Sequence, residues 1–351
     1  MKDKIIELLE QVLHPETELG LISSGFVDGV EVGDERIFVS LCFAKARDPF
    51  AVKIKNQVEH LLVESFPAMQ GKISIMIKEA APQKKPKREA PSATSGVANV
   101  IAISSAKGGV GKSTVAANLA ITLRDMGFRV GILDADIYGP SQPKMFGCED
   151  YQPEAIVHDG FDFMLPAIAR EVKIMSIGFF VSENDALLWR GVMATNALKQ
   201  LVHQTQWGSL DFLLIDLPPG TGDIHLSLLT ELRVTSAVIV STPQQMAIAD
   251  VRRGVEMFRH EQVNVPIAGL IENMSWFTPA ELPDNRYYIF GHGGAEDFAR
   301  NNNVPFLGNI PIVQSIMECG DKGESVIEQN EAVAEAYRSI TERVIANTLR
   351  Q

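Results

Sequence analysis

Apolar residues follow two different patterns along the chain, and the pattern changes near residue 97. After that point, short continuous apolar runs alternate with longer stretches of helical spacing. Runs that are apolar on both faces are typical of strands in a parallel sheet with helices on either side. We therefore predict an α/β domain over residues 98–351. Its predicted strands span 99–104, 129–133, 212–215, 237–241 and 267–271, and its helices include 113–126, 247–260 and 331–349.

The first 80 residues predict a separate, smaller α+β domain. Apolar residues recur at helical spacing over residues 4–13. Pro15 is expected to end that helix, because a proline disfavours helical geometry in the residue before it. Strands are then predicted at 26–32 and 36–43 around a turn at Gly33 and Asp34, a helix at 51–65, and a strand at 72–77. Residues 81–97, rich in Pro, Lys, Ala and Ser, are predicted to be a linker between the two domains.

Charge and cysteine content narrow the possible partners. The net charge is −12, so the chain as a whole repels phosphate backbones, and no nucleic-acid partner is expected. The dense basic cluster of Lys84, Lys85, Lys87 and Arg88 indicates a solvated linker, or alternatively a weak anion-binding tether. No apolar run is long enough to cross a membrane, and the final predicted helix carries mixed charges, so no membrane partner is expected. Three widely separated cysteines and no signal-peptide pattern favour a cytoplasmic location.

The strongest chemical signal is a glycine-rich loop between the first predicted strand of the large domain and the helix after it. It comprises Ala106, Lys107, Gly108, Gly109, Val110, Gly111, Lys112, Ser113 and Thr114. Glycines let backbone N–H groups approach phosphate oxygens, and the following helix N-terminus adds positive potential. We expect Lys112 to neutralise the β and γ phosphates, Ser113 to ligate Mg²⁺, and Thr114 to bond the α phosphate of ATP.

One position of this loop departs from the usual pattern. The P-loop motif begins with glycine, and here that position is Ala106. Glycine loops also occur as simple tight turns, but the Gly-Lys-Ser-Thr ending and the flanking strand and helix favour nucleotide binding.

Carboxylates follow two other predicted strands. Asp134 and Asp136 come directly after the strand at 129–133, and Asp216 follows the strand at 212–215. Carboxyl ends of parallel strands gather ligand groups, and magnesium prefers oxygen ligands, so these acids are candidates for the metal region. The alternative for the first pair is an Asp-rich turn that caps a helix. The loop after Asp216 resembles a switch that responds to the γ phosphate, and Asp223 at its end is expected to cap the next helix.

The run from Lys107 to Ser113 resembles the deviant Walker A motif of the MinD/ParA-type ATPases. That resemblance implies a nucleotide-sandwich homodimer in which Lys107 reaches the partner's nucleotide. It also implies that Asp136 orients the attacking water and that Asp134 supports the metal shell. Asn273 would hydrogen-bond adenine, and the loop 308–311, with Pro311, would pack near the base.

More of the chain is similar to one branch of that superfamily, the Mrp/ApbC iron–sulfur cluster carrier ATPases. The resemblance runs over about residues 97–345, and residues 1–80 look like the small SufT-type domain of bacterial members. The runs that carry it are 107–114, 134–141, 189–191, 216–223, 272–275 and 288–294. It implies ATP hydrolysis, a bridging [4Fe–4S] cluster, and iron–sulfur apoproteins or assembly factors as partners.

The sequence departs from that branch at the cluster motif. Most members have a Cys-x-x-Cys pair soon after the segment matching 272–275, whereas residues 276–283 here contain no cysteine. Clusters are normally held by thiolates, so the ligands in this chain are unknown. Cys42, Cys148 and Cys319 have no ligand spacing and are expected to be small buried residues. Cys319 is the least implausible ligand among them, and a single His292 does not make a site.

The sequence is therefore consistent with three functional hypotheses. The first is an ATP-hydrolysing homodimer that assists iron–sulfur cluster assembly or delivery. The second is an ATP-driven partner-binding scaffold that no longer carries a cluster. The third is a MinD- or ParA-like positioning ATPase, which the acidic balance and the absence of a basic amphipathic tail disfavour.

Overall fold

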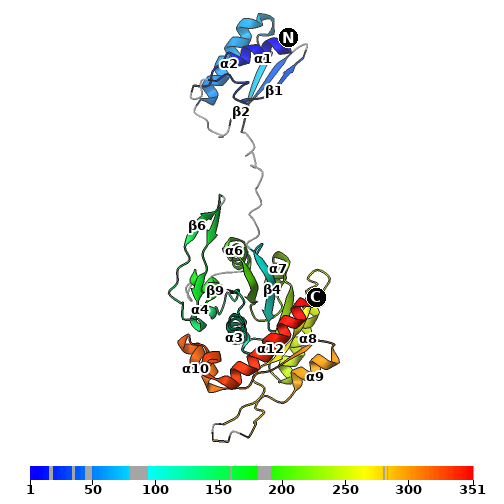
Figure 1. Cartoon of the computed structure of the whole chain (residues 1–351). Helices are drawn as coiled ribbons and strands as arrows, with labels where there is room; N and C mark the ends of the chain where they lie inside the picture. Colours follow the sequence, from blue (N-terminus) through cyan, green and yellow to red (C-terminus); the bar gives the residue numbers. More distant parts are fainter. Residues whose placement is uncertain are drawn as a thin grey trace. The chain divides into compact units, whose positions relative to one another are not determined.

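The computed structural model divides the chain into two compact units, Met1–Glu89 and Ala90–Gln351 (Figure 1). It describes residues 1–15, 19–33, 36–43, 50–79, 94–158, 160–180, 191–279, 281–282 and 284–350. The basic cluster of the predicted linker and the Asp34 part of the predicted turn lie outside these ranges, as do Trp189 and Arg190.

The small unit packs two helices against a three-stranded sheet. The strands lie in the order β1-β2-β3, with β1 and β2 antiparallel and β2 and β3 parallel. Helix α1 ends at Glu10 rather than at residue 13, so the first helix is shorter than predicted. The elements are α1 (Lys2–Glu10), β1 (Val27–Val32), β2 (Ile37–Phe43), α2 (Ala51–Ser65), η1 (Pro67–Met69) and β3 (Ile73–Glu79).

The described part of the large unit contains a sheet of eight strands in the order β13-β12-β11-β4-β10-β5-β9-β8. All neighbouring pairs are parallel except β8 and β9, so the predicted mostly parallel sheet is confirmed. The strands are β4 (Val97–Ser104), β5 (Val130–Asp134), β8 (Ala167–Ala169), β9 (Val172–Ser176), β10 (Leu210–Asp216), β11 (Ser236–Ser241), β12 (Ile267–Glu272) and β13 (Phe306–Asn309). A separate hairpin pairs β6 (Ala155–His158) with β7 (Phe161–Met164).

Helices cover both faces of this sheet. The cluster of buried residues on one face includes side chains of α3, α10, α11 and α12, and the cluster on the other includes side chains of α6, α7, α8 and α9. The helices are α3 (Lys112–Asp125), α4 (Gln142–Met145), η2 (Ile177–Phe179), α6 (Gly191–Gln204), α7 (Asp223–Glu231), α8 (Gln245–Arg259), α9 (Gly294–Asn301), α10 (Gln314–Lys322), α11 (Val326–Gln329) and α12 (Glu331–Leu349).

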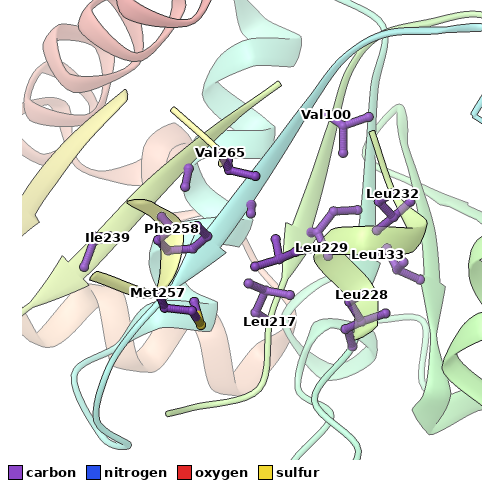
Figure 2. Packing of buried hydrophobic residues seen from close by; sticks show 14 of the residues in the cluster. Val100, Leu133, Leu217, Leu228, Leu229, Leu232, Ile239, Met257, Phe258 and Val265 are labelled. Atoms are coloured by element: carbon purple, nitrogen blue, oxygen red, sulfur yellow. The ribbon is translucent and has the colours of Figure 1, made fainter. Parts of the chain in front are cut away.

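Strand β10 shows why continuous apolar runs were the correct signal. Phe212 and Leu214 enter the cluster that contains α3 and α12, while Leu213 and Ile215 enter the opposite one. Successive side chains of a strand point to opposite faces, so a strand buried on both sides needs an apolar residue at every position. Each such side chain contributes roughly 1.5–3 kcal/mol when fully buried. Figure 2 shows the cluster that includes side chains of α6, α7, α8 and α9, where Leu228, Leu229 and Leu232 of the α7 region pack together.

The strand order determines which loops meet. Strand β10 lies between β4 and β5, and Asp216 at its end is in register with Asp134 of β5 and with Ile103 of β4. Because all three strands are parallel, the glycine loop after β4 and the acids ending β5 and β10 come together at one edge of the sheet.

Candidate functional site

The glycine loop turns tightly into helix α3. Gly109 and Gly111 have φ angles of +80° and +81°, a left-handed backbone that side-chain-bearing residues rarely adopt. Gly111 is the N-cap of α3, and Lys112 is its first residue. Lys112 is buried, whereas Gly108 and Gly109 are exposed. The loop therefore presents backbone groups to solvent beside a helix N-terminus, which is the arrangement that binds phosphate.

Lys112 is paired with the acid at the end of β10. Its ammonium Nζ lies 2.6 Å from Asp216 Oδ1 and donates a second bond of 3.1 Å to Ser113 Oγ. The other Asp216 oxygen accepts a hydrogen bond of 2.8 Å from Nε2 of Gln142. Asp216 is fully buried. One of its oxygens accepts a charge-assisted hydrogen bond from Lys112, and the other accepts a hydrogen bond from the neutral amide of Gln142.

Asp134 is also fully buried and lies at the end of β5. Its oxygens accept bonds from the backbone N–H groups of Asp136, Ser141 and Gln142 and from the Ser176 hydroxyl. Burial, and after it the neighbouring Asp216 carboxylate, raises the pKa of Asp134 to about 7. The Asp134 side chain therefore fixes the backbone conformation of the loop 134–142 through these hydrogen bonds.

Asp136 is mostly buried and faces the loop after β10. Burial raises the pKa of this carboxyl, while the positive charge of Lys112 opposes that shift. It lines a cavity of about 590 Å³ together with Pro218, Pro219 and His225. The structure thus brings Asp136 and the predicted switch loop together. Helix α7 begins at Asp223 with Gly222 at the N-cap, so the expectation that Asp223 caps this helix was wrong by one position.

A second cavity, of about 580 Å³, lies beside the glycine loop. Its lining includes Gly111, Thr114, Asn273 and Pro311. Asn273 Nδ2 donates a hydrogen bond of 2.9 Å to the carbonyl of Val110. The predicted base-binding residues therefore lie beside the phosphate loop. Its lining is largely apolar, as a purine ring requires, and the following residues add to it: Ile289, Phe290, Ile312, Val313, Ile316, Met317 and Tyr337.

The absence of a side chain at Gly111 makes room for Asn273. A Cβ atom on Gly111 would lie 2.3 Å from Asn273 Nδ2, which is closer than any real contact. The loop 308–311 was predicted as a loop throughout, but Gly308 and Asn309 belong to β13. The short β13 and its pairing with β12 bring Pro311 to the cavity.

Lys107 stands apart from the residues gathered around Lys112. Its side chain is exposed, and no hydrogen bond or ion pair joins it to another residue in the described part of the chain. A lysine side chain that makes no hydrogen bond or ion pair with the described residues of its own chain can bind a ligand or a group of another molecule. Its neighbour Ala106 is half-buried.

Two residues near the acids were missed from the sequence. Gln142 is fully buried and contacts Asp216, as described above. His225 is 2% exposed, and its Nε2 lies 2.8 Å from the carbonyl oxygen of Pro218. Burial lowers the pKa of His225, which favours the neutral ring. Neither residue belongs to a charge pattern or motif spacing that could have identified it. The only signal for Gln142 is its position directly after the run 134–141.

The charges around the loop suit a divalent cation bound with a nucleotide. Lys112 supplies one positive charge against the carboxyls of Asp134, Asp136 and Asp216. Magnesium is usually held by one or two carboxylates together with substrate phosphates and waters. Within the described residues, no three His, Cys, Asp or Glu side chains form a group that could hold a metal ion by themselves. Ser113 and these acids therefore fit a metal that arrives with phosphate oxygens.

Cys319 belongs to a buried cluster of the large unit and Cys148 packs against the same cluster, whereas Cys42 belongs to the small unit. Cys319 is 2% exposed and donates a hydrogen bond of 3.3 Å from Sγ to Gln329, so it packs as a buried residue. Burial raises the pKa of its thiol and raises that of half-buried Cys148 to about 11. Cys42 is half-buried in the small unit. The environments of Cys148 and Cys319 disfavour the thiolates that a cluster requires.

Aromatic side chains contact one another in the segment that follows residues 272–275. Arg286 stacks over the ring of Trp276 at 4.4 Å, and Phe277 forms an antiparallel bridge with Tyr287. His292 packs its ring edge-on against Tyr288, with ring centroids 4.4 Å apart. Cation–π and aromatic contacts therefore stabilise the described part of this segment.

No helix among the described residues has both the length and the apolar character that a bilayer-spanning helix requires.

Comparisons with known proteins agree with this geometry. Residues 96–345 match the family model described as NUBPL iron-transfer P-loop NTPase, and residues 2–75 match the one described as iron–sulfur cluster assembly protein. An iron–sulfur cluster carrier protein from Synechocystis is 36% identical over 346 residues, covering 97% of this chain and 96% of that protein. Another protein of that name, from Escherichia coli, is 46% identical over 253 residues, covering 72% of this chain and 67% of that protein.

Solved structures give the same fold. A nucleotide-binding protein from Archaeoglobus fulgidus in complex with ADP is 37% identical, with a TM-score of 0.57, covering 66% of this chain and 88% of that one. The MinD cell division ATPase of Pyrococcus furiosus is 21% identical, with a TM-score of 0.51, covering 71% of this chain and 99% of that one. At that identity the second similarity supports the fold alone.

Proposed function

Because the chain belongs to the NUBPL iron-transfer P-loop NTPase family, we propose that it binds and hydrolyses ATP and assists the assembly or transfer of iron–sulfur clusters. The family assignment agrees with the resemblance predicted from the sequence. The observation that carries the ATPase part is the buried Lys112–Asp216 pair beside a left-handed glycine loop at the edge of the sheet.

In this proposal the glycine loop holds the phosphates. Backbone N–H groups between Ala106 and Thr114 surround the phosphate oxygens, and Lys112 leaves Asp216 to neutralise the β and γ phosphates. Thr114 bonds the α phosphate. Asn273 and Pro311 hold the adenine in the apolar cavity of about 580 Å³ beside the loop.

Ser113, Asp134 and Asp216 would hold Mg²⁺, directly or through its waters. The metal would supply charge neutralisation of the phosphates when bound. Asp136, which lines the neighbouring cavity with the switch loop, orients the attacking water. The raised pKa of Asp136 brings its carboxyl nearer to the range in which it can also accept a proton.

Two copies of the chain would act together. The exposed Lys107 has no partner within the described part of one copy, which suits a lysine that stabilises charge on the nucleotide of the other copy. We therefore propose a homodimer that closes around two nucleotides. Its further partners would be iron–sulfur apoproteins or assembly factors.

The test of the cluster function is anaerobic reconstitution with iron and sulfide, followed by iron assay, visible absorption, and transfer to an apoprotein that needs a [4Fe–4S] cluster. The proposal expects ATP to change the rate of cluster appearance in the acceptor. An acceptor that matures equally fast without this protein or without ATP would contradict it. Hydrolysis is measured in parallel as released phosphate, so the ATPase and the transfer role are judged separately.

A second function has one specific observation in its favour. The described part of residues 276–288 is held by the Trp276–Arg286 stack and contains no thiolate. An ATP-driven scaffold that binds assembly partners, with the cluster on the partner, would need no ligands here. A colourless, iron-free protein that still speeds transfer between two other proteins would favour this form of the function.

A further inference from the structure

Gln142 joins three parts of the candidate site. Its Nε2 donates hydrogen bonds of 2.8 Å to Asp216 Oδ2 and 3.0 Å to the carbonyl oxygen of Ser113, and its backbone N–H donates to Asp134 at 3.0 Å. One fully buried residue therefore links the ends of β10 and β5 to the first turn of α3. Lys112 and Gln142 share the two oxygens of Asp216.

The orientation of the Gln142 amide is fixed by its partners. Both atoms that its NH₂ group contacts are acceptors, so the opposite orientation would place an oxygen against two oxygens. The carbonyl Oε1 therefore faces away from Asp216. It is buried and has no hydrogen-bond partner among the described residues, and the same is true of the adjacent Ser141 hydroxyl.

A buried acceptor of this kind calls for a donor, and none of the described residues donates a hydrogen bond to it. Phosphate oxygens accept hydrogen bonds and cannot fill this role, and the Lys112 ammonium already donates to Asp216 and Ser113. Waters on Mg²⁺ are strong donors, and magnesium keeps several of them when it binds to proteins. Gln142 is placed beside Ser113, Asp134 and Asp216, which are the proposed metal residues.

We propose that Gln142 is a positioning residue of the magnesium site, whose amide nitrogen holds Asp216 in place and whose Oε1 accepts a hydrogen bond from a water bound to Mg²⁺. This inference rests on the proposed nucleotide function. Residues behind the direct metal ligands commonly change metal affinity by about 10- to 100-fold when replaced, so the effect should be measurable.

The test compares ADP binding by calorimetry with excess Mg²⁺ and with EDTA, using the full chain. Gln142→Met keeps the length of the side chain and removes the amide. We expect the gain in ADP affinity that Mg²⁺ provides to fall by about tenfold or more, with the affinity in EDTA within about twofold of the original. Gln329→Met makes the same chemical change on α11, outside the site, and should leave both affinities unchanged.

Gln142→Glu is the second variant, and it separates the oxygen from the nitrogen. The carboxyl keeps an acceptor in place of Oε1, and its second oxygen, which replaces the amide nitrogen beside Asp216 Oδ2, can keep that contact only as a protonated donor. The magnesium-dependent gain should therefore be reduced, but retained in larger part than with methionine. Direct Mn²⁺ binding with ADP, followed by electron paramagnetic resonance, should rank the affinities as original, then Glu, then Met.

Three results would overturn the inference. One is a Met variant whose melting temperature falls while the magnesium-dependent gain is unchanged, because Gln142 would then be a structural brace. Another is an equal loss of affinity with and without Mg²⁺. If the Met variant does not fold, a Glu variant that loses the whole gain also overturns it. By contrast, an original protein that binds ADP equally with and without Mg²⁺ would count against the proposed function itself.

Discussion

The ammonium of Lys112 and the carboxylate of Asp216 lie 2.6 Å apart in a site where the lysine side chain is 5% exposed and the aspartate side chain 0%. The lysine that we propose binds the phosphates is thus paired with the acid that we assign to the metal region. ATP with Mg²⁺ would provide new partners for both, since phosphate takes the lysine and the metal takes the aspartate. The pair neutralises two buried charges within the protein.

The first prediction concerns this pair. Lys112→Ala should abolish hydrolysis because the phosphates lose their main counter-ion. It should also lower the free energy of unfolding by about 3–5 kcal/mol, because Asp216 is left as a buried unpaired charge. Phosphate release and urea unfolding without nucleotide measure the two effects.

The matched control removes both charges. In Lys112→Met with Asp216→Asn, most of the lost stability should return while hydrolysis stays absent. If the single and double variants were equally unstable, the buried charge would not be the cause.

The second prediction concerns Lys107. Because its side chain is exposed and has no partner in the described part of the chain, Lys107→Ala should leave stability and ADP affinity nearly unchanged. Hydrolysis should fall by about 10³-fold or more if this lysine stabilises charge in trans. Mixing Lys107→Ala with Lys112→Ala protein should restore some turnover, since one kind of mixed dimer pairs an intact Lys107 with an intact loop. Normal turnover in the single variant would argue against a lysine that acts across a dimer.

The third prediction concerns Gly111 and Asn273. Gly111→Ala places a Cβ against Asn273 on a backbone with φ of +81°, so we expect a loss of about 1–2 kcal/mol in stability together with weaker nucleotide binding. Asn273→Ala should weaken ATP binding by about three- to tenfold, the value of one hydrogen bond, and bring ATP and GTP affinities closer together. Calorimetry with both nucleotides measures this, and an unchanged ratio would remove Asn273 from base recognition.

The fourth prediction concerns pH. Arg129 donates to both oxygens of Asp211, and these hydrogen bonds lower the pKa of Asp211 to about 2 from an ordinary value of 3.8. A lowered pKa stabilises the fold above the unfolded value, and this contribution is lost as the pH falls from about 4 to 2. The Asp211 side chain is 32% exposed and screened by solvent, so we expect about 1 kcal/mol. Asp211→Asn should be less stable than the original protein by that amount at pH 7, and the gap should narrow towards pH 2. A gap that does not change with pH would show that the ion pair is not its source.

The parts of the fold and site that follow from local pattern were predictable from the sequence. The glycine loop, the apolar runs of β4 and β10, and the acids that end β5 and β10 all depend on residues close together in the chain. The register between Asp216 and Asp134 follows once those strands are neighbours, but the neighbour order itself is a tertiary property.

The parts that were missed depend on packing between distant segments. Gln142 and His225 are neutral or polar residues whose burial comes from the surrounding loops, and a lone glutamine carries no spacing signal. Strand β13 is short, and its pairing with β12 includes a register shift, so the local sequence pattern predicts a loop at Gly308. Helix α1 ends at Glu10, where the chain turns before reaching Pro15, although the apolar spacing continues to Val12.

The thiol environments have a practical consequence for handling the protein. Cys148 has a pKa of about 11, and the Cys319 sulfur is enclosed, so at neutral pH almost none of either thiol is in the reactive anionic form. The nucleotide chemistry should therefore survive purification in air and treatment with an alkylating reagent. Oxygen would then affect only the iron–sulfur cluster that the protein handles, and not its ATPase activity.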